Sequence, residues 1–185
     1  MKAHRLFIFT LLSIFFGQIY ASIGPVSHGF VLADNNREVS VYICTDYEPV
    51  VEIAMQMYDA DMKDVTGKRV SIRKNATIRL YQLNRMTTRA LEQLRKKGIP
   101  VNQVERTMDA FCIKIIDRKV YVVGNNGRGV AYGLLELSRM AGVSPWKWWG
   151  DVVPEKRERL VLPPAFETVQ APSVAYRGIF LNDED

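Results

Sequence analysis

The chain has 185 residues, of which 48% are hydrophobic and 24% are charged, a composition that fits one ordinary globular domain and excludes a disordered chain. The formal net charge of +5 falls to +3 if an N-terminal leader that carries Lys2 and Arg5 is removed, and so small a balance argues against a polyanionic partner. A basic trio at residues 95–97 has no interleaved aromatic residues. We therefore expect it to complement a helix dipole rather than to bind nucleic acid.

Residues 1–21 are typical of a secretory signal peptide. Lys2 and Arg5 precede an apolar run over residues 6–16, and Ile19 and Ala21 suit positions −3 and −1 of a cleavage site. The apolar run is shorter than the roughly 20 residues that a spanning helix needs. We therefore expect cleavage after Ala21, a secreted or periplasmic protein, and no membrane association of the mature chain.

The rest of the chain alternates between strand and helix patterns. We expect strands over residues 29–34, 38–45, 76–83, 110–116 and 119–123, and helices from Thr45 to Gly67, over residues 88–97 and over residues 128–140. The two residues between the last two strands predict a hairpin, although Asp-Arg is not a favoured pair for a tight primed turn. This order predicts an α+β fold with a mixed sheet and with the helices on one face.

The first long helix carries two local patterns. Thr45 and Glu48 have the spacing of a capping box, and Gly67 is a typical helix stop. Asp59, Asp61 and Asp64 lie off the apolar stripe. We expect them to form a solvated face rather than a metal site, because no second set of ligands accompanies them.

The glycine-rich segment over residues 124–129 precedes the last helix. Its spacing is G-x-x-G-x-G, which is not the dinucleotide-binding pattern, and no Walker lysine follows. We expect a sharp strand-to-helix turn with left-handed backbone rather than a nucleotide site. A weak affinity for anions at the helix start remains open.

Cys44 and Cys112 both lie within apolar strand patterns. A secreted chain could pair them. We favour two unpaired thiols in the core, since free cysteine behaves as a small hydrophobic residue. The sequence shows no cluster of histidine, cysteine and carboxylate with metal-ligand spacing, so we expect neither a metal nor a cofactor.

Two stretches carry candidate binding chemistry. Trp146, Trp148 and Trp149 lie within four residues, and the chain closes on Asn182, Asp183 and two further acidic residues after a short apolar run. The tryptophans could form a hydrophobic plug or present an indole face to a sugar ring, and both interpretations stay open. The acidic end could be a solvated tail or could supply the carboxylates that glycosidic chemistry requires.

These stretches also carry a family resemblance. The segments SPWKWWGDVVP and YRGIFLNDED resemble the junction between the N-terminal domain and the catalytic barrel of family 115 glycoside hydrolases, the xylan α-1,2-glucuronidases. GRGVAYGLLELSRMAGV and VSVYICTDYEPVVEIAMQMYDADMKDVTG are similar to the last helix and to the first strand and helix of that domain. The glycine-rich helix start also resembles family 67 α-glucuronidases and the N-terminal domains of β-hexosaminidases.

The resemblance implies a division of the chain. It implies an α+β N-terminal domain over residues 22–150, a linker over residues 151–175, and the first strand of an incomplete (β/α)8 barrel over residues 176–185. It assigns Trp146, Asn182 and Asp183 to substrate binding. A glycosidase needs two carboxyl groups that flank the scissile bond, and the family's other functional residues would lie beyond position 185, so no catalytic residue is assigned within this chain.

The function implied is that of a fragment. The full enzyme would remove glucuronic or 4-O-methylglucuronic acid side chains from xylan, and we expect this chain alone to be inactive. Its partner would be glucuronoxylan or its oligosaccharides, and a homodimer of the full-length enzyme stays open. The alternative is a carbohydrate-binding or scaffold module without chemistry. The sequence leaves open the exact sugar and the identity of the general acid and base.

Overall fold

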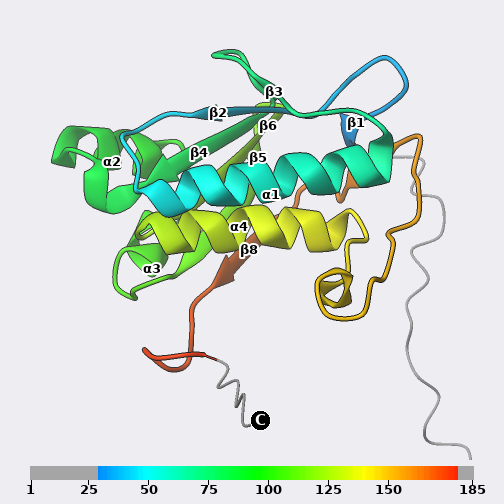
Figure 1. Ribbon diagram of the computed structural model, residues 1–185. Coiled ribbons are helices and arrows are strands. Elements are labelled where there is room, and N and C mark those ends of the chain that lie inside the picture. Colours follow the sequence, from blue (N-terminus) through cyan, green and yellow to red (C-terminus); the bar gives the residue numbers. More distant parts are fainter. Residues whose placement is uncertain (1–28, 179–185) are drawn as a thin grey trace, which may run out of the picture.

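The computed structural model describes residues 29–178, in which helices pack against a mixed sheet (Figure 1). The strands are β1 (Phe30–Ala33), β2 (Ser40–Ile43), β3 (Ser71–Ile72), β4 (Ile78–Gln82), β5 (Phe111–Ile116), β6 (Lys119–Gly124), β7 (Leu160–Leu162) and β8 (Glu167–Gln170). The helices are α1 (Pro49–Thr66), α2 (Thr88–Lys96), α3 (Val101–Val104) and α4 (Gly127–Met140), with 3-10 turns η1 (Leu83–Arg85) and η2 (Pro145–Lys147). None of the helices within residues 29–178 combines the length and apolarity needed to cross a membrane.

The main sheet has six strands in the order β3-β2-β4-β6-β5-β8. Strands β3, β2, β4 and β6 are mutually parallel, whereas β5 runs antiparallel to both of its neighbours. A second, two-stranded sheet pairs β1 with β7. The predicted α+β class and mixed sheet are confirmed.

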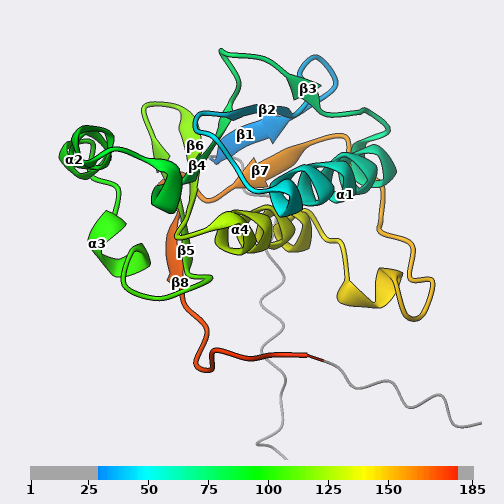
Figure 2. The same cartoon turned by 60° about the vertical axis from the view of Figure 1, so that its left-hand side comes forward.

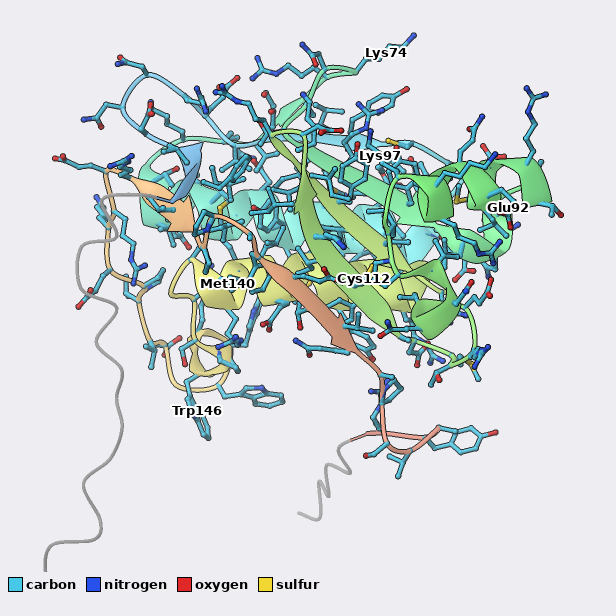
Figure 3. All side chains as sticks on the ribbon, turned by 180° about the vertical axis from the view of Figure 1, so that it is seen from behind. Lys74, Glu92, Lys97, Cys112, Met140 and Trp146 are labelled. Carbon is cyan, nitrogen blue, oxygen red and sulfur yellow. The ribbon has the colours of Figure 1, made fainter. Side chains whose placement is uncertain are left out.

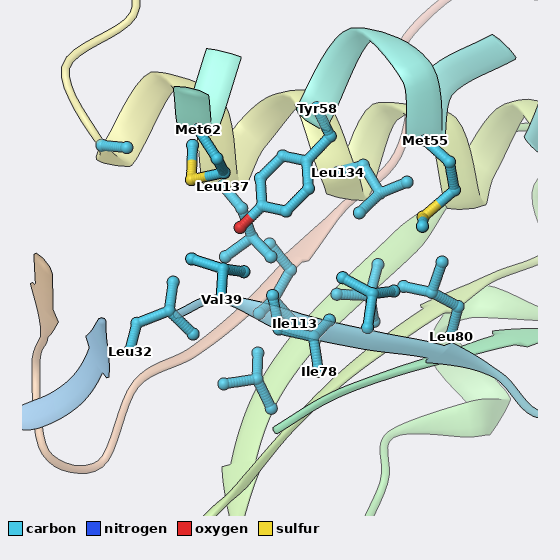
Figure 4. Packing of buried hydrophobic residues seen from close by; sticks show 14 of the residues in the cluster. Leu32, Val39, Met55, Tyr58, Met62, Ile78, Leu80, Ile113, Leu134 and Leu137 are labelled. Carbon is cyan, nitrogen blue, oxygen red and sulfur yellow. The ribbon is translucent and has the colours of Figure 1, made fainter. Parts of the chain in front are cut away.

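Helices α1 and α4 lie side by side on one face of the sheet (Figure 1). Their apolar stripes, spaced by three and four residues, point at the strands and form the larger core. Figure 4 shows Tyr58 of α1 and Leu134 of α4 above Ile78 and Ile113 of the sheet. The Tyr58 hydroxyl is buried toward Val39 and has no hydrogen-bond partner among the described residues.

The expectation that the helices cover only one face is wrong for the short helices. Figure 2 shows α2 and α3 on the side of the sheet opposite α1 and α4. The reason lies in β6, where Val120 and Val122 belong to the larger core while Tyr121 and Val123 belong to a second core with Leu94 of α2. A central strand that is apolar on both faces must be covered on both faces.

The hairpin between β5 and β6 is confirmed. Asp117 and Arg118 form its two-residue turn with φ of 48° and 59°, the left-handed conformation that a type I′ turn requires at both positions. The pairing extends from Phe111 opposite Gly124 to Ile116 opposite Lys119. This continuous ladder imposes a turn conformation that the Asp-Arg pair does not favour by itself.

The predicted capping box at the start of α1 is wrong. Glu48 is the N-cap residue, but its side chain makes no capping bond. The Thr45 hydroxyl instead accepts from the backbone N–H of Gln82 at 3.1 Å, and the Glu48 carboxylate accepts from Gln82 Nε2 at 2.9 Å. The end of β4 supplies donors that compete with the first turn of the helix. The predicted stop at Gly67 is confirmed, with φ of 75°.

The segment expected as a linker over residues 151–175 contains two strands. Leu160 and Leu162 of β7 are buried, and β8 extends the main sheet at the edge of β5. Both strands are too short to give a readable alternation in the sequence, so their pairing is decided by the partner strands. The expected barrel strand is not confirmed, because residues 176–178 form no strand and residues 179–185 lie outside the described part. The expected signal peptide, residues 1–21, also lies outside it.

Candidate functional site

A loop that carries all three tryptophans follows α4. Ser144 caps the 3-10 turn η2, since its hydroxyl accepts from the backbone N–H of Trp146 at 3.2 Å. Trp146, Trp148 and Trp149 are 65%, 63% and 63% exposed. The interpretation as a hydrophobic plug is therefore wrong, and the rings are presented outward. Figure 3 shows Trp146 on the loop beyond the end of α4.

Lys147 fixes this loop to helix α1. Its Nζ lies 2.7 Å from Asp61 Oδ1 and 2.8 Å from Asp64 Oδ2, and Asp61 is 3% exposed. Burial alone would lower the pKa of Lys147, but the hydrogen bonds to Asp61 and Asp64 outweigh burial and raise that pKa. The expected solvated acidic face is wrong for Asp61, because the cation that pairs with it comes from a distant loop that the sequence does not place.

The loop forms one wall of a groove of about 720 Å³. Trp148 and Trp149 line the groove together with Tyr132 and Leu135 of α4 and with Pro172 of the segment after β8. Trp146, the tryptophan singled out from the sequence, is not among the lining residues. The groove thus combines exposed indole faces with an apolar helix surface, which is the kind of wall on which the C–H faces of a sugar ring stack.

Asp109 also lines the groove and is the centre of a polar cluster. This residue is 3% exposed and has φ of 65°. Its carboxylate accepts from Asn126 Nδ2 at 2.8 Å and pairs with Arg128 Nε and Arg177 Nη2, each at 3.0 Å. The Arg177 guanidinium also lies 5.1 Å from the ring centroid of Tyr132. Arg177 is thereby anchored to the domain.

All three carboxylates that line the groove are held in ion pairs. Asp61 pairs with Lys147, Asp109 with two arginines, and Glu136 with Arg139 at 2.7 Å. The hydrogen bond from Arg139 lowers the pKa of Glu136. A general acid needs a raised pKa so that it carries a proton at neutral pH. The Glu136 carboxyl group is therefore poorly suited to protonating a leaving group.

The turn over residues 124–129 requires glycine for a different reason than predicted. None of its glycines has positive φ. They are required by close packing instead: a Cβ at Gly124 would lie 2.2 Å from Val130 N, and one at Gly129 would lie 2.4 Å from Ala110 O. Asn126 caps α4 by accepting from Gly129 N at 2.9 Å.

The carboxylate of Glu48 lies at the N-terminus of α4. The Glu48 carboxylate accepts from Gly127 N at 3.2 Å, so it occupies the position that a bound anion would take. The possible weak anion site at this helix start is thus occupied by the chain itself.

The remaining candidate residues divide into two groups. Asn182 and Asp183 lie outside the described residues. Cys44 and Cys112 are unpaired, as the preferred interpretation predicts, but only Cys112 lies in the core, whereas Cys44 is half-buried. Burial raises the pKa of the Cys112 thiol to about 12. Within residues 29–178, no group of three or more histidine, cysteine or carboxylate residues is placed to hold a metal.

Known proteins give one informative similarity. No protein-family model and no curated protein matches the chain. A family GH115 4-O-methyl-α-glucuronidase with specificity for decorated arabinogalactans is similar over 84% of this chain and 20% of its own, with 36% sequence identity and a TM-score of 0.72. The resemblance predicted from the tryptophan loop and the glycine-rich helix is therefore confirmed.

Two further solved structures are more distant. A GH138 enzyme that targets pectin rhamnogalacturonan II matches 75% of this chain and 12% of its own, with 19% identity and a TM-score of 0.42. A β-hexosaminidase from Streptomyces plicatus matches 80% of this chain and 24% of its own, with 12% identity and a TM-score of 0.49. The chain spans about a fifth of the length of the GH115 enzyme.

Proposed function

Because this chain is similar in sequence and fold to part of a family 115 α-glucuronidase, we propose that it is the N-terminal portion of an exported glycoside hydrolase of that type. The complete enzyme would remove glucuronic or 4-O-methylglucuronic acid side chains from a plant polysaccharide. The observation that carries the proposal is the 36% identity over 84% of this chain. Export follows from the signal-like residues 1–21.

The substrate class is a uronate-bearing polysaccharide. Glucuronoxylan is the partner that the sequence resemblance suggests. The similar GH115 enzyme has specificity for decorated arabinogalactans, and this specificity supports arabinogalactan side chains as the second candidate.

In this proposal the described domain contributes a wall and not the acid. Trp148 and Trp149 offer their indole faces to the sugar, while the carboxylates of the groove stay paired with cations. Trp146 would join them only if the substrate extends outward along the loop. Asn182 and Asp183 follow the anchored Arg177 in sequence and would belong to the catalytic half of the site.

Two measurements test this proposal together. The purified chain should release no glucuronate from a glucuronic-acid-bearing xylo-oligosaccharide, and an antibody to it should detect a product several times heavier in the source organism. Release of glucuronate by this chain would refute the assignment of catalysis to a missing part. A natural product of the size of this chain would instead favour the alternative, a binding or scaffold module without chemistry.

The contribution of the groove can be tested separately. Trp148→Ala or Trp149→Ala should weaken oligosaccharide binding by about tenfold, since truncation of an aromatic contact in a binding site typically costs about 1–2 kcal/mol. Trp146→Ala is the matched control for the loop. If Trp146→Ala alone abolishes binding, the sequence-based assignment of Trp146 to substrate binding is right, and the assignment of binding to Trp148 and Trp149 is wrong.

A further inference from the structure

The sheet face opposite α1 and α4 carries a row of side chains that the proposed function does not use. Tyr42 of β2 pairs in register with Arg79 of β4, and Arg79 pairs in register with Tyr121 of β6. The three residues therefore stand side by side across three neighbouring parallel strands. Figure 3 views the molecule from this side, with Lys97 of the adjoining connection labelled.

Aromatic rings and cations alternate on this face. The ring of Tyr81 stacks on Tyr121, with centroids 6.0 Å apart and planes inclined by 16°. The Arg79 guanidinium lies 5.8 Å from the ring centroid of Tyr42, and Lys97 Nζ lies 5.6 Å from that of Tyr121. We refer to Tyr42, Tyr81 and Tyr121 as the tyrosine face.

The tyrosine face lines a hollow of about 830 Å³ that α2 and the segment before it close on one side. Four cationic side chains and one carboxylate line the hollow: Arg79, Arg85, Lys97, Lys119 and Asp117. Within residues 29–178, only Lys97 among these cations makes an ion pair, with Asp117 at 3.2 Å. The hollow therefore carries an excess of positive charge.

The arginines are better placed for an external anion than the lysine of β6. Lys119 Nζ donates to the carbonyl oxygens of Asn75 and Ala76 at 3.2 and 2.9 Å, so it is engaged by the chain. Arg79 donates from Nη1 to the carbonyl oxygen of Lys74 at 3.2 Å and from Nε to the Tyr81 hydroxyl at 3.4 Å. Its Nη2 makes no hydrogen bond within residues 29–178. Arg85 is exposed at the rim.

We propose that the tyrosine face binds the uronate residue of an acidic oligosaccharide. Arg79 and Arg85 hold the carboxylate, and the rings of Tyr42 and Tyr81 contact the C–H faces of the sugar. Arginine suits this role because its planar fork matches a carboxylate. The site is distinct from the groove lined by Trp148 and Trp149, which we call the tryptophan groove and which lies on the side of α4. The choice of a sugar over other ring-bearing anions rests on the proposed function, but the existence of the site does not.

Nucleic acid is the competing ligand, since it also combines rings with negative charge. Sites for single strands follow the backbone along a positively charged groove and contact several phosphates in succession. Here Arg79 and Arg85, which make no ion pair within residues 29–178, line a single hollow. The chain as a whole has a small net charge. One carboxylate flanked by sugar rings fits this distribution better.

The test is a calorimetric titration of the purified chain with three probes: a glucuronic-acid-bearing xylo-oligosaccharide, the same compound with its carboxyl group reduced, and a thymidine oligonucleotide. We expect the acidic sugar to bind and the reduced sugar to bind at least tenfold more weakly. Equal binding of the two sugars would overturn the proposal, and so would tighter binding of the oligonucleotide.

Variants locate the binding on this face. Arg79→Gln should weaken at least tenfold the component of binding that distinguishes the acidic sugar from the reduced sugar, and binding in the groove lined by Trp148 and Trp149 should not change. Arg85→Gln should weaken the same component several-fold without affecting the fold, because Arg85 is exposed. Lys96→Gln, an exposed cation of α2 outside the hollow, is the matched control and should leave binding unchanged. Wild-type affinity in both arginine variants would overturn the proposal.

A final variant separates this site from the tryptophan groove. Trp149→Ala should leave the arginine-dependent component of binding intact. If Trp149→Ala removes all binding while Arg79→Gln removes none, the groove is the sugar site and the tyrosine face is not. If neither face binds, both assignments fail.

Discussion

The tryptophan loop should depend on a single cation for its position. We predict that Lys147→Met destabilises the protein by about 3 kcal/mol, because the substitution leaves the Asp61 carboxylate, 3% exposed, without its partner. The methionine keeps most of the aliphatic volume of lysine. The loss therefore reports the charge and not a cavity.

The magnitude follows from the geometry. At the 2.7 Å separation of Lys147 Nζ and Asp61 Oδ1, an effective dielectric constant of about 20 gives a gross attraction of about 6 kcal/mol. Desolvation of the two groups cancels part of it, and removal of one partner from a buried pair typically costs about 3–5 kcal/mol. The second pair is weaker, since the Asp64 side chain is 46% exposed and an exposed pair contributes at most about 1 kcal/mol.

The assay is equilibrium unfolding in urea, followed by far-UV circular dichroism and by tryptophan fluorescence. Asp64→Asn is the matched control and should cost less than about 1 kcal/mol. The double variant Lys147→Met/Asp61→Leu should be more stable than Lys147→Met alone, because it removes the orphaned charge. A cost below about 1 kcal/mol for Lys147→Met would refute the claim that this ion pair holds the loop.

Three further predictions concern the core. Tyr58→Phe should leave the free energy of unfolding unchanged or raise it by about 1 kcal/mol, since the buried hydroxyl has no partner among the described residues; a loss above 1 kcal/mol in urea unfolding would contradict this. Gly133→Ala should lower the free energy of unfolding by about 1–3 kcal/mol, because the added Cβ would lie 2.4 Å from Val122 Cγ1. A thermal melt that matches wild type would contradict this and would show that α4 shifts freely. Burial raises the pKa of Cys112 from 9.0 to about 12, so the unfolded chain loses this proton first and stability falls as the pH rises from 9 toward 12. Between pH 7 and pH 10, wild type should lose about 1.4 kcal/mol more than Cys112→Ala, and parallel pH profiles of the two proteins would disprove the assignment.

Much of the fold could be predicted from periodicity. The apolar stripe of α1, the alternation in β4 and the hairpin at Asp117 were all readable because local pattern and tertiary role agree there. The prediction of strands failed where pairing with a distant strand, and not the local sequence pattern, determines the structure. Strands β7 and β8 have three and four residues, and their pairing with β1 and β5 has no local signal.

The candidate site could be predicted only in part. The tryptophan cluster was visible as composition, but which rings line a groove depends on how Lys147 docks onto α1. The partner of Lys147 is Asp61, which lies across the fold. The expectation that Asp61 lies off the apolar stripe of α1 is wrong, because Asp61 is buried beside Tyr58 and Met62. Asp61 follows Tyr58 by three residues, one helical turn, and an aspartate at such a position is a signal of a buried cationic partner.

The pairing of β1 with β7 has a consequence for how the protein is made. Phe30 lies opposite Leu162, so strands from the two ends of the described chain must meet before the small sheet exists. Contacts between residues so distant in sequence form late and slowly, because the intervening chain must be ordered first. β1 therefore stays without its partner strand until residues 160–162 are available, and the apolar side chains of Phe30 and Leu32 are not covered by the small sheet before then.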